Sequence, residues 1–473
     1  MKREFPTIHF YDQDFVDIYD QTWAWIGDLW HKGTQRNKLQ PKYFNYTGNT
    51  SIDQFEAIFS TFYLVYSNRI HPAAPQLDNF YGRQEKDGAI RWEYDVKTGK
   101  PVFTDDNPEG VGPPLFAWAE YNMYHKIGNK KRIREVLPIL EAYFMWLDET
   151  FKRDNGLYEV PPAATMMYNS PRKGMHYPVD FNTQQALSAL YISELADILN
   201  DKELSFRFKR HYFSLKTRIN SLMWNDDDGV YYDLDAKEQQ IGVKTIATFW
   251  PLLAELVNEA KLEKLEAHLK NPETFGTEHP FPSLAADEPQ FDERGKAFQG
   301  SVFPPFTFMV IKGLEKYAKF DFARQAAIRH LYYMLDTLHP DGKNKGEVWE
   351  AYAPRKDGAA QWPGNKRGFP RPGFVTYTAL SSVALMIENI VGLYISLPRK
   401  TVDWIVPTLE IMGIENLALK RNMITILSNK SGRGWEIRLE SEKLYYFTID
   451  ILGRKKKTLP IPSGKCSMLI DKL

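Results

Sequence analysis

Cysteine is nearly absent from this 473-residue sequence, which contains only Cys466. A single thiol excludes an intrachain disulfide and a metal site built from several cysteines. A net charge is absent as well, because 60 Lys and Arg residues balance 60 Asp and Glu residues. A protein without an excess of one sign lacks the general field that draws nucleic acid or an anionic membrane surface. We therefore expect a small or neutral ligand and no nucleic-acid partner.

Long apolar runs are missing too. No stretch reaches the length that spans a bilayer, and the opening residues, MKREFPTIHFYDQDF, lack the apolar core of a signal peptide. The sequence therefore predicts no membrane span. It predicts a cytoplasmic protein, or a periplasmic or secreted one if a leader was removed from this numbering. No pattern predicts the oligomeric state. The acidic run at residues 226–228 lacks the alternating ligands of a calcium loop, so we expect no metal and no cofactor.

Aromatic residues are abundant, with 12 Trp, 26 Tyr and 29 Phe in the chain. Flat rings fill the interfaces between helices, and they also suit the apolar C–H faces of sugar rings. The composition therefore mildly favours a carbohydrate ligand.

Helical periodicity dominates the chain from Asp14 to about residue 395. Apolar residues recur there at three- and four-residue spacing, as in TQQALSALYISELADILND, and loops rich in Pro, Gly and Asp separate the segments. Three of these loops resemble one another: DNGLYE (154–159), DDDGVYYDLD (226–235) and PDGKNKGEVWEAY (340–352). Such repetition indicates stacked helical hairpins whose corresponding loops gather on one face.

Strand periodicity replaces the helical pattern after about residue 397. Apolar and polar residues alternate in stretches such as GWEIRLESEKLYYFTIDIL, with turn signals between the stretches. We therefore predict a mainly α protein, with an (α/α)6 toroid over residues 1–396 and a small C-terminal β-sheet domain over residues 397–473. A helical solenoid is the structural alternative, but long irregular loops fit it poorly.

Several ordered motifs resemble one family of enzymes. They include QLDNFYGRQEKDGAIRWE (76–93), DNGLYEVPPAATMMYNSPR (154–172), FQGSVFPPFTFMVIKGLEKY (298–317) and VWEAYAP (348–354). Over about residues 50–392 the chain is similar to the six-hairpin, α/α-toroid glycoside hydrolases, a group that contains trehalases, processing α-glucosidases and mannosylglycerate-hydrolase-like enzymes. The resemblance implies hydrolysis of an α-glycosidic bond in an oligosaccharide or small glycoside, with inversion and without a cofactor.

The resemblance also names a general base. Inversion needs a protonated carboxyl group for the leaving oxygen and a carboxylate that activates water, about 6.5–9.5 Å apart. The family's base is the Glu of a W/Y-E-x-Y-x-P motif, which Trp349, Glu350, Tyr352 and Pro354 match. Glu350 is therefore the expected base, whereas nearby Glu347 lacks the motif position and is expected to be a surface carboxylate.

The expected general acid is missing from its motif. The family carries it as an Asp in a loop of the form G-M/W-D-N-S-P-R, whereas this sequence reads MMYNSPR, with Tyr168 in place of the Asp. A phenol, whose ordinary pKa is about 10, transfers its proton less readily than a tuned carboxylic acid. Asp180, which matches a family Asp that orients the site, and Glu159 of the same loop are the other candidates for the acid.

Two other functions stay open. Tyr168 with Arg172 and His176 is the equipment for β-elimination on uronic acids, in which Arg neutralises the carboxylate and Tyr shuttles protons; polysaccharide lyases also use helical toroids. A sugar-binding protein that has lost hydrolysis is the second alternative. Neither function requires Glu350, so the intact W-E-x-Y-x-P motif favours hydrolysis.

The remaining candidates are substrate-binding residues. Phe298 and Phe303 replace both Trp residues of the family's W-x-G-x-W stretch, which keeps Gln299, and Trp362 in the later insertion can supply a replacement ring. The other candidates are the motif residues Asp78, Tyr81, Arg83, Gln84, Trp118, Glu120, Asn169, Arg172, His176, Trp349 and Tyr352.

Overall fold

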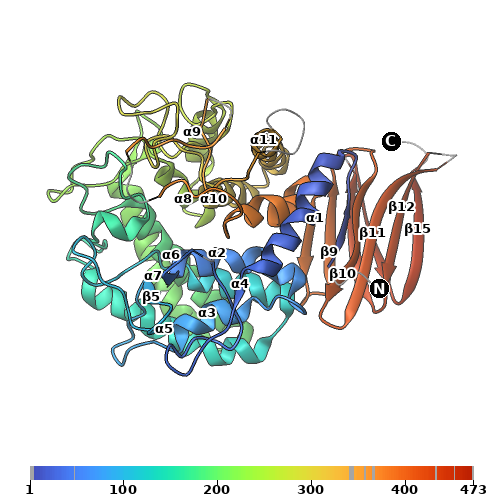
Figure 1. The fold of residues 1–473 in the computed structure, drawn as a ribbon, viewed down its shortest axis with the longest axis horizontal. Coiled ribbons are helices and arrows are strands. Elements are labelled where there is room, and N and C mark those ends of the chain that lie inside the picture. The colour runs from blue at the N-terminus through green and yellow to red at the C-terminus, as the bar shows by residue number, and fades with distance from the viewer. Residues whose placement is uncertain are drawn as a thin grey trace.

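The chain is mainly helical and ends in a region of strands, as predicted (Figure 1). This computed structural model describes residues 5–46, 48–339, 346–355, 358–364, 368–431, 434–451 and 453–470, without the side chains of residues 431 and 466–470. Within these ranges, no helix combines the length and the apolar character needed to cross a membrane.

One set of helices is buried on nearly every side. Contacts pass from α2 to α4, and then to α6, α8, α10 and the π-helix η4, and η4 returns to α2. A helix that is enclosed in this way is apolar or small around its whole surface, as the sequence LSSVALMIENI of η4 illustrates. These ring helices are α2 (Gln54–Leu64), α4 (Phe116–Ile127), α6 (Val179–Leu199), α8 (Trp250–Leu253), α10 (Pro304–Lys316) and η4 (Leu380–Ile390).

A second set of helices lies outside the ring and exposes one face. In α1, for example, Phe15, Ile18 and Tyr19 are buried, whereas Asp14 and Asp17 are not. Each outer helix alternates along the chain with a ring helix. The outer helices are α1 (Gln13–Asp28), α3 (Ala74–Tyr81), α5 (Lys130–Phe151), α7 (Lys202–Leu222), α9 (Glu259–Lys270) and α11 (Phe320–Leu338). Single turns η1 (Val65–Ser67), η2 (Pro162–Thr165) and η3 (Ile246–Phe249) complete the helical region.

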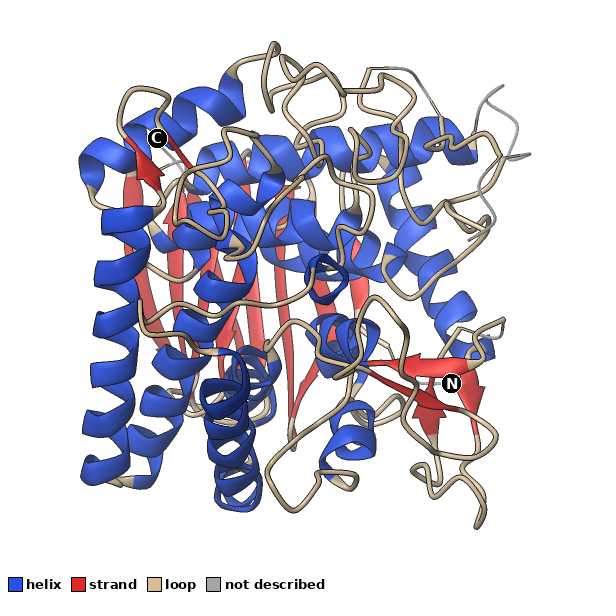
Figure 2. Cartoon of the chain, turned by 90° about the vertical axis from the view of Figure 1, so that its left-hand side faces the viewer, coloured by secondary structure: helices blue, strands red, loops and turns tan. Residues whose placement is uncertain are grey.

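The C-terminal strands form two sheets behind the helices in the view of Figure 2. The larger sheet has the order β1-β10-β11-β12-β15, in which β1 (Thr7–His9) comes from the N-terminal end, and the smaller has the order β14-β13-β9-β8. Burial alternates along the strands, as in β13, where Phe447 and Ile449 are buried and Tyr446 is exposed. The C-terminal strands are β8 (Leu393–Ser396), β9 (Thr401–Val406), β10 (Met412–Leu419), β11 (Asn422–Ser431), β12 (Gly434–Ser441), β13 (Tyr445–Ile451), β14 (Lys455–Ile461) and β15 (Gly464–Ile470). Short ribbons pair β2 (Trp30–His31) with β3 (Tyr43–Phe44), β4 (Ser51–Asp53) with β5 (Glu93–Asp95), and β6 (Trp224–Asn225) with β7 (Val230–Tyr231).

An N-terminal strand joins the larger sheet. β1 (Thr7–His9) pairs antiparallel with β10, and His9 Nε2 lies 3.0 Å from the Glu415 carboxylate. The sequence pattern did not predict β1, because three residues are too few for strand alternation to show. The division into residues 1–396 and 397–473 stays a prediction.

A buried ion cluster joins three of the ring helices. Lys312 Nζ of α10 lies 2.6 Å from the Glu388 carboxylate of η4, Lys126 Nζ of α4 lies 3.2 Å from it, and the Tyr66 hydroxyl donates to it. Burial by itself raises the pKa of Glu388, but the two lysines outweigh burial and lower the pKa to about 2. Ionised Glu388 therefore stabilises the fold above its ordinary pKa of 4.5, and this contribution is lost as the pH falls through about 2.

We expect Lys312→Met to lower the free energy of unfolding by about 3 kcal/mol or more, because the buried Glu388 charge loses a partner. Denaturant unfolding followed by tryptophan fluorescence measures this change. Lys131→Met is the matched control, because the Lys131 side chain is 82% exposed in its pair with Glu135. Equal losses in the two variants would contradict a role for the cluster in stability.

Candidate active site

The N-terminal ends of four ring helices, α2, α4, α10 and η4, lie close together. Gln54 Nε2, at the start of α2, donates to the Pro113 carbonyl just before α4 (2.8 Å). Phe55 stacks with Phe303, which precedes α10, at 6.5 Å between ring centroids, and Phe303 packs edge-on against Tyr377, before η4, at 5.1 Å. Because outer helices return the chain between ring helices, the ring helices run in one direction. The loops that precede them therefore gather on one face.

Glu350 lies in the loop before η4, and Arg371 holds its carboxylate. Glu350 is 8% exposed. The Arg371 backbone N–H donates to Oε2 (3.0 Å) and Arg371 Nη2 donates to Oε1 (2.8 Å), while the Glu350 N–H donates to the Arg371 carbonyl (3.1 Å). A bridge between Trp349 and Pro372 continues this pairing. One residue of the insertion that follows Glu350 therefore contacts both of its carboxylate oxygens.

Arg371 also reaches the ring helix α2. Its Nη2 donates to Glu56 Oε1 (2.8 Å) and its Nη1 donates to Asn49 Oδ1 (3.0 Å). Burial opposes the charge on Arg371, but Glu56 and Glu350 outweigh burial and raise the pKa of the guanidinium above its usual range. Neither Glu56 nor Arg371 was predicted from the sequence, because a pair separated by 315 residues leaves no local pattern.

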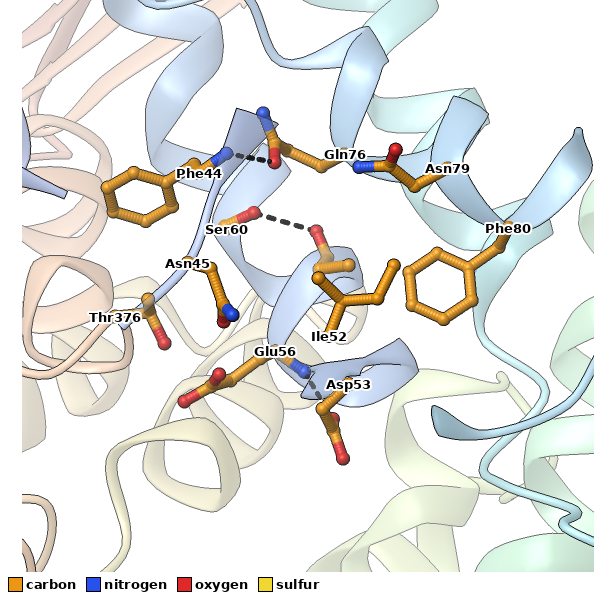
Figure 3. Close-up of a pocket in the computed structure, with 11 residues that line it drawn as sticks. Phe44, Asn45, Ile52, Asp53, Glu56, Ser60, Gln76, Asn79, Phe80 and Thr376 are labelled. Carbon is orange, nitrogen blue, oxygen red and sulfur yellow. Dashed lines mark hydrogen bonds between the residues drawn. The ribbon is translucent and has the colours of Figure 1, made fainter. Parts of the chain in front are cut away.

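Asp53 is a further buried carboxyl group beside Glu56. It caps α2 by accepting the Glu56 N–H (2.8 Å), and the Trp92 indole N–H donates to its other oxygen. Burial raises the pKa of Asp53 to about 8, with added repulsion from Glu93 and Glu56, which favours the protonated form of this group. Figure 3 shows Asp53 and Glu56 at the start of α2, on the wall of a pocket of ≈ 10 Å³, which has room for about one water.

Tyr168 lies in an aromatic wall made by three loops. Its ring stacks with Trp362 at 6.1 Å between centroids and meets Phe298 edge-on at 5.1 Å. Phe298 in turn contacts Phe303 at 5.7 Å. The acid loop, the stretch with two Phe residues and the later insertion therefore come together. Trp362, which the sequence offers as a substitute for the Trp rings replaced by Phe298 and Phe303, stacks on Tyr168, and its role in binding stays a prediction.

Asn169 joins the acid loop to the stretch around Phe298. Its Nδ2 donates to the Lys296 carbonyl (3.0 Å) and its Oδ1 accepts the Phe298 backbone N–H (2.8 Å). Gln299 Nε2 returns a bond to the Asn169 carbonyl (3.0 Å). The predicted binding residues Asn169 and Gln299 therefore each form hydrogen bonds to the loop that carries the other.

Arg172 forms a sealed ion cluster with Asp180 and Asp233. Its guanidinium donates to both oxygens of Asp180 (2.9 Å each) and to both oxygens of Asp233 (2.6 Å each). Each of the three side chains is 2% exposed. Burial raises the pKa of Asp180, and the Arg172 guanidinium opposes that rise. The sequence analysis did not single out Asp233, which lies in the acidic loop at residues 226–235.

Four predicted binding residues lie in or near another ion cluster. Arg132 donates to Glu120 (2.9 and 2.7 Å) and to Asp78 (2.9 Å), and the Tyr81 hydroxyl donates to Glu120 (3.0 Å). Trp118 is 5% exposed and packs among buried aromatic rings. No interaction found within the described ranges connects this cluster with Glu350.

Three more predicted residues are engaged in other contacts. Arg83 donates to backbone carbonyls, including that of Asn79 (2.6 Å), and Gln84 Nε2 donates to two other backbone carbonyls (3.0 and 2.8 Å). His176 Nδ1 lies 2.6 Å from the carboxylate of Glu159. Hydrogen bonds from His176, together with those from Arg153, lower the pKa of Glu159. The binding roles of these residues stay predictions.

Two family descriptions match the chain. Residues 83–369 match the mannosylglycerate hydrolase MGH1-like glycoside hydrolase domain, and residues 392–473 match the C-terminal domain of trehalase. An uncharacterized protein of Borreliella burgdorferi is 52% identical over 474 residues and is covered completely, as is this chain.

Solved structures share the fold. The chain superposes on a sialidase with a TM-score of 0.73 at 13% identity, covering 98% of this chain but only 41% of the sialidase. The GH63 mannosylglycerate hydrolase of Thermus thermophilus, solved in complex with glucose, superposes with a TM-score of 0.60 at 17% identity, covering 78% of this chain and 98% of that enzyme. At these identities the likeness concerns the fold alone.

We expect Asn169→Ala to speed hydrogen exchange of the Phe298 amide by about 10-fold, because that buried N–H loses its acceptor. Exchange measured by NMR or mass spectrometry gives the rate. Ser170→Ala is the adjacent control, because the buried Ser170 Oγ has no hydrogen-bond partner among the described residues. Similar exchange in both variants would show that Asn169 does not hold the two loops together.

Proposed function

Because the chain belongs to the mannosylglycerate hydrolase MGH1-like glycoside hydrolases, we propose that it hydrolyses an α-glycosidic bond of a small glycoside or oligosaccharide, with inversion. The proposed scaffold is an (α/α)6 toroid. The ring from α2 to η4 supplies its inner helices and the alternating helices supply its outer layer. The likeness to the fold of the Thermus mannosylglycerate hydrolase supports this scaffold.

Glu350 is the proposed general base. The observation that carries the proposal is its buried carboxylate, which accepts a hydrogen bond from Arg371 on each oxygen. The Arg371 backbone N–H and guanidinium hold the Glu350 carboxylate in place, and a carboxylate can take a proton from water. Each carboxylate oxygen has two lone pairs, so a water can bind to Glu350 without displacing Arg371.

The other motif residues hold the Glu350 loop in place. Tyr352 exchanges backbone hydrogen bonds with Val302 (2.9 and 3.0 Å), and its buried hydroxyl accepts the Trp349 N–H (3.0 Å). Two residues of the W-E-x-Y-x-P motif, Trp349 and Tyr352, are thereby tied to each other and to the segment before α10. This arrangement supports a fixed position for the base, which a general base needs in order to face its water.

The proton donor is proposed among three groups. Tyr168 occupies the acid position of the motif and lies against Trp362. Asp180 is the second candidate, although both its oxygens already accept from Arg172. Asp53 joins them because its raised pKa favours the protonated form of its carboxyl group, as a general acid requires.

Hydrolysis is favoured over β-elimination by the contacts of Arg172. Elimination on a uronic acid requires this guanidinium to bind the carboxylate of the substrate. Arg172 already pairs with two aspartates and is 2% exposed. A substrate carboxylate would have to replace one of these buried partners, at the cost of leaving an aspartate unpaired.

We expect Glu350→Gln to lower kcat by about 10²–10⁴-fold, because an amide cannot accept the proton of the attacking water. A panel of α-glycosides identifies the substrate, and NMR of the first-formed product, expected as the β-anomer, tests inversion. Glu347→Gln is the control, because Glu347 is exposed. Unchanged turnover in Glu350→Gln would exclude this residue as the base. Sugar binding without turnover of any glycoside would favour the binding-protein alternative.

The donor is identified with substrates that differ in leaving group. We expect loss of the true acid to slow a glycoside with a poor leaving group far more than an activated aryl glycoside, which needs no protonation. Tyr168→Phe, Asp180→Asn and Asp53→Asn are compared in this way. Thermal unfolding accompanies the kinetics, because Asp180→Asn also removes a buried partner of Arg172. A donor role is contradicted for any variant that slows both substrates equally.

A further inference from the structure

Building on the proposed function, we propose that Arg371 and Glu56 are positioning residues that together set the protonation of the Glu350 carboxyl group. One nitrogen, Arg371 Nη2, donates to Glu350 Oε1 and to Glu56 Oε1, each at 2.8 Å. These two carboxylate oxygens are therefore no farther apart than twice 2.8 Å. At such a distance two carboxylates repel each other strongly unless a cation lies between them.

Burial makes this repulsion matter. Glu350 is 8% exposed, Glu56 is 6% exposed, and the Arg371 side chain is 22% exposed. Solvent screens charges poorly in such surroundings. A guanidinium stays charged at every pH at which the protein is folded. The positive charge at the site is therefore constant.

The groups around the pair carry no second cation among the described residues. Asp53 lies on the same end of α2, and Glu93 of β5 acts on it. The Tyr46 ring lies 5.0 Å from the Arg371 guanidinium carbon. Tyr377, before η4, is fully buried, and burial together with Glu56, Asp53 and Glu350 raises the pKa of its phenol, which Arg371 opposes. Within the described ranges, Arg371 is the one cation that forms an ion pair with both Glu56 and Glu350.

Removal of the Arg371 side chain should leave Glu350 and Glu56 without a shared cation. Two adjacent buried carboxylates then avoid repulsion by binding about one proton between them. That proton blocks Glu350 as a base whenever it resides there. Removal of the Glu56 carboxylate alone should disfavour proton binding at this site, because the Arg371 guanidinium then pairs with Glu350 only.

Geometry and charge can be separated at this site. The Arg371 backbone N–H donates to Glu350 Oε2 whatever side chain follows it, and the Glu350 N–H keeps its bond to the Arg371 carbonyl. Substitution of the side chain therefore removes the charge while these backbone contacts persist. A change in protonation is then attributable to charge.

The experiment compares Arg371→Gln, Glu56→Gln and the double variant with the unaltered chain. Difference titration and the infrared band of protonated carboxyl groups count bound protons without a substrate. We expect Arg371→Gln to bind about one extra proton at neutral pH and to move the acid limb of the kcat/KM profile up by about one pH unit or more. In the double variant Arg371→Gln/Glu56→Gln, the number of bound protons and the position of the acid limb should return toward those of the unaltered chain. Arg371→Lys should keep the original acid limb.

Controls separate this inference from the proposed function. Arg294→Gln removes a guanidinium that is 47% exposed and pairs with Asp292, and it should move neither quantity. If Arg371→Gln behaves like Arg294→Gln, the inference is wrong, while the base assignment survives provided that Glu350→Gln abolishes turnover. If Glu350→Gln stays active, the base assignment fails and proton counting still tests the charge pair. If Arg371→Gln does not fold, Glu56→Gln tests the proposal by itself. The acid limb of its kcat/KM profile should move to lower pH, and an acid limb that does not move overturns the proposal.

Discussion

The contact between η4 and α2 closes the ring of helices, and the candidate active site depends on this closure. It brings Glu56, near the start of the ring, to Arg371 and Glu350, which precede its last helix. Aromatic rings pack across the junction at the N-terminal ends of these helices, where Phe55 and Phe303 both contact Tyr377. Loops far apart in the chain therefore face one another at a fixed distance.

Two arginines, Arg172 and Arg371, hold the loops at this end of the ring by the same physical means. Arg172 binds two aspartates, one on the loop after α7 and one at the start of α6, and Arg371 binds glutamates on two different elements. The planar fork of a guanidinium suits two carboxylates at once, and a lysine would offer only a point charge. Such pairs add little to net stability, but breaking one leaves an uncompensated buried charge. Their main effect is to define which loop lies against which.

Much of the architecture could be predicted from local patterns. Three- and four-residue periodicity identified the helices, because burial of one face repeats at that spacing, and alternation identified the C-terminal strands. The W-E-x-Y-x-P motif directed attention to Glu350, which the structure buries and pairs with Arg371. Local patterns failed for β1, which is too short to alternate. They also gave no sign that the Arg83 guanidinium donates to backbone carbonyls such as that of Asn79.

The order of residues along the chain was sufficient for the helical class, the strands at the end and the candidate base, since each of these rests on neighbours within a few positions. Only the folded chain decided which charges meet. Glu56 became part of the site because ring closure placed it beside Arg371, which also binds Glu350, and Asp180 was enclosed because Arg172 and Asp233 reached it through space. Electrostatic energy depends on the distance between charges in space and on their burial, and neither quantity is written in the spacing of residues along the sequence.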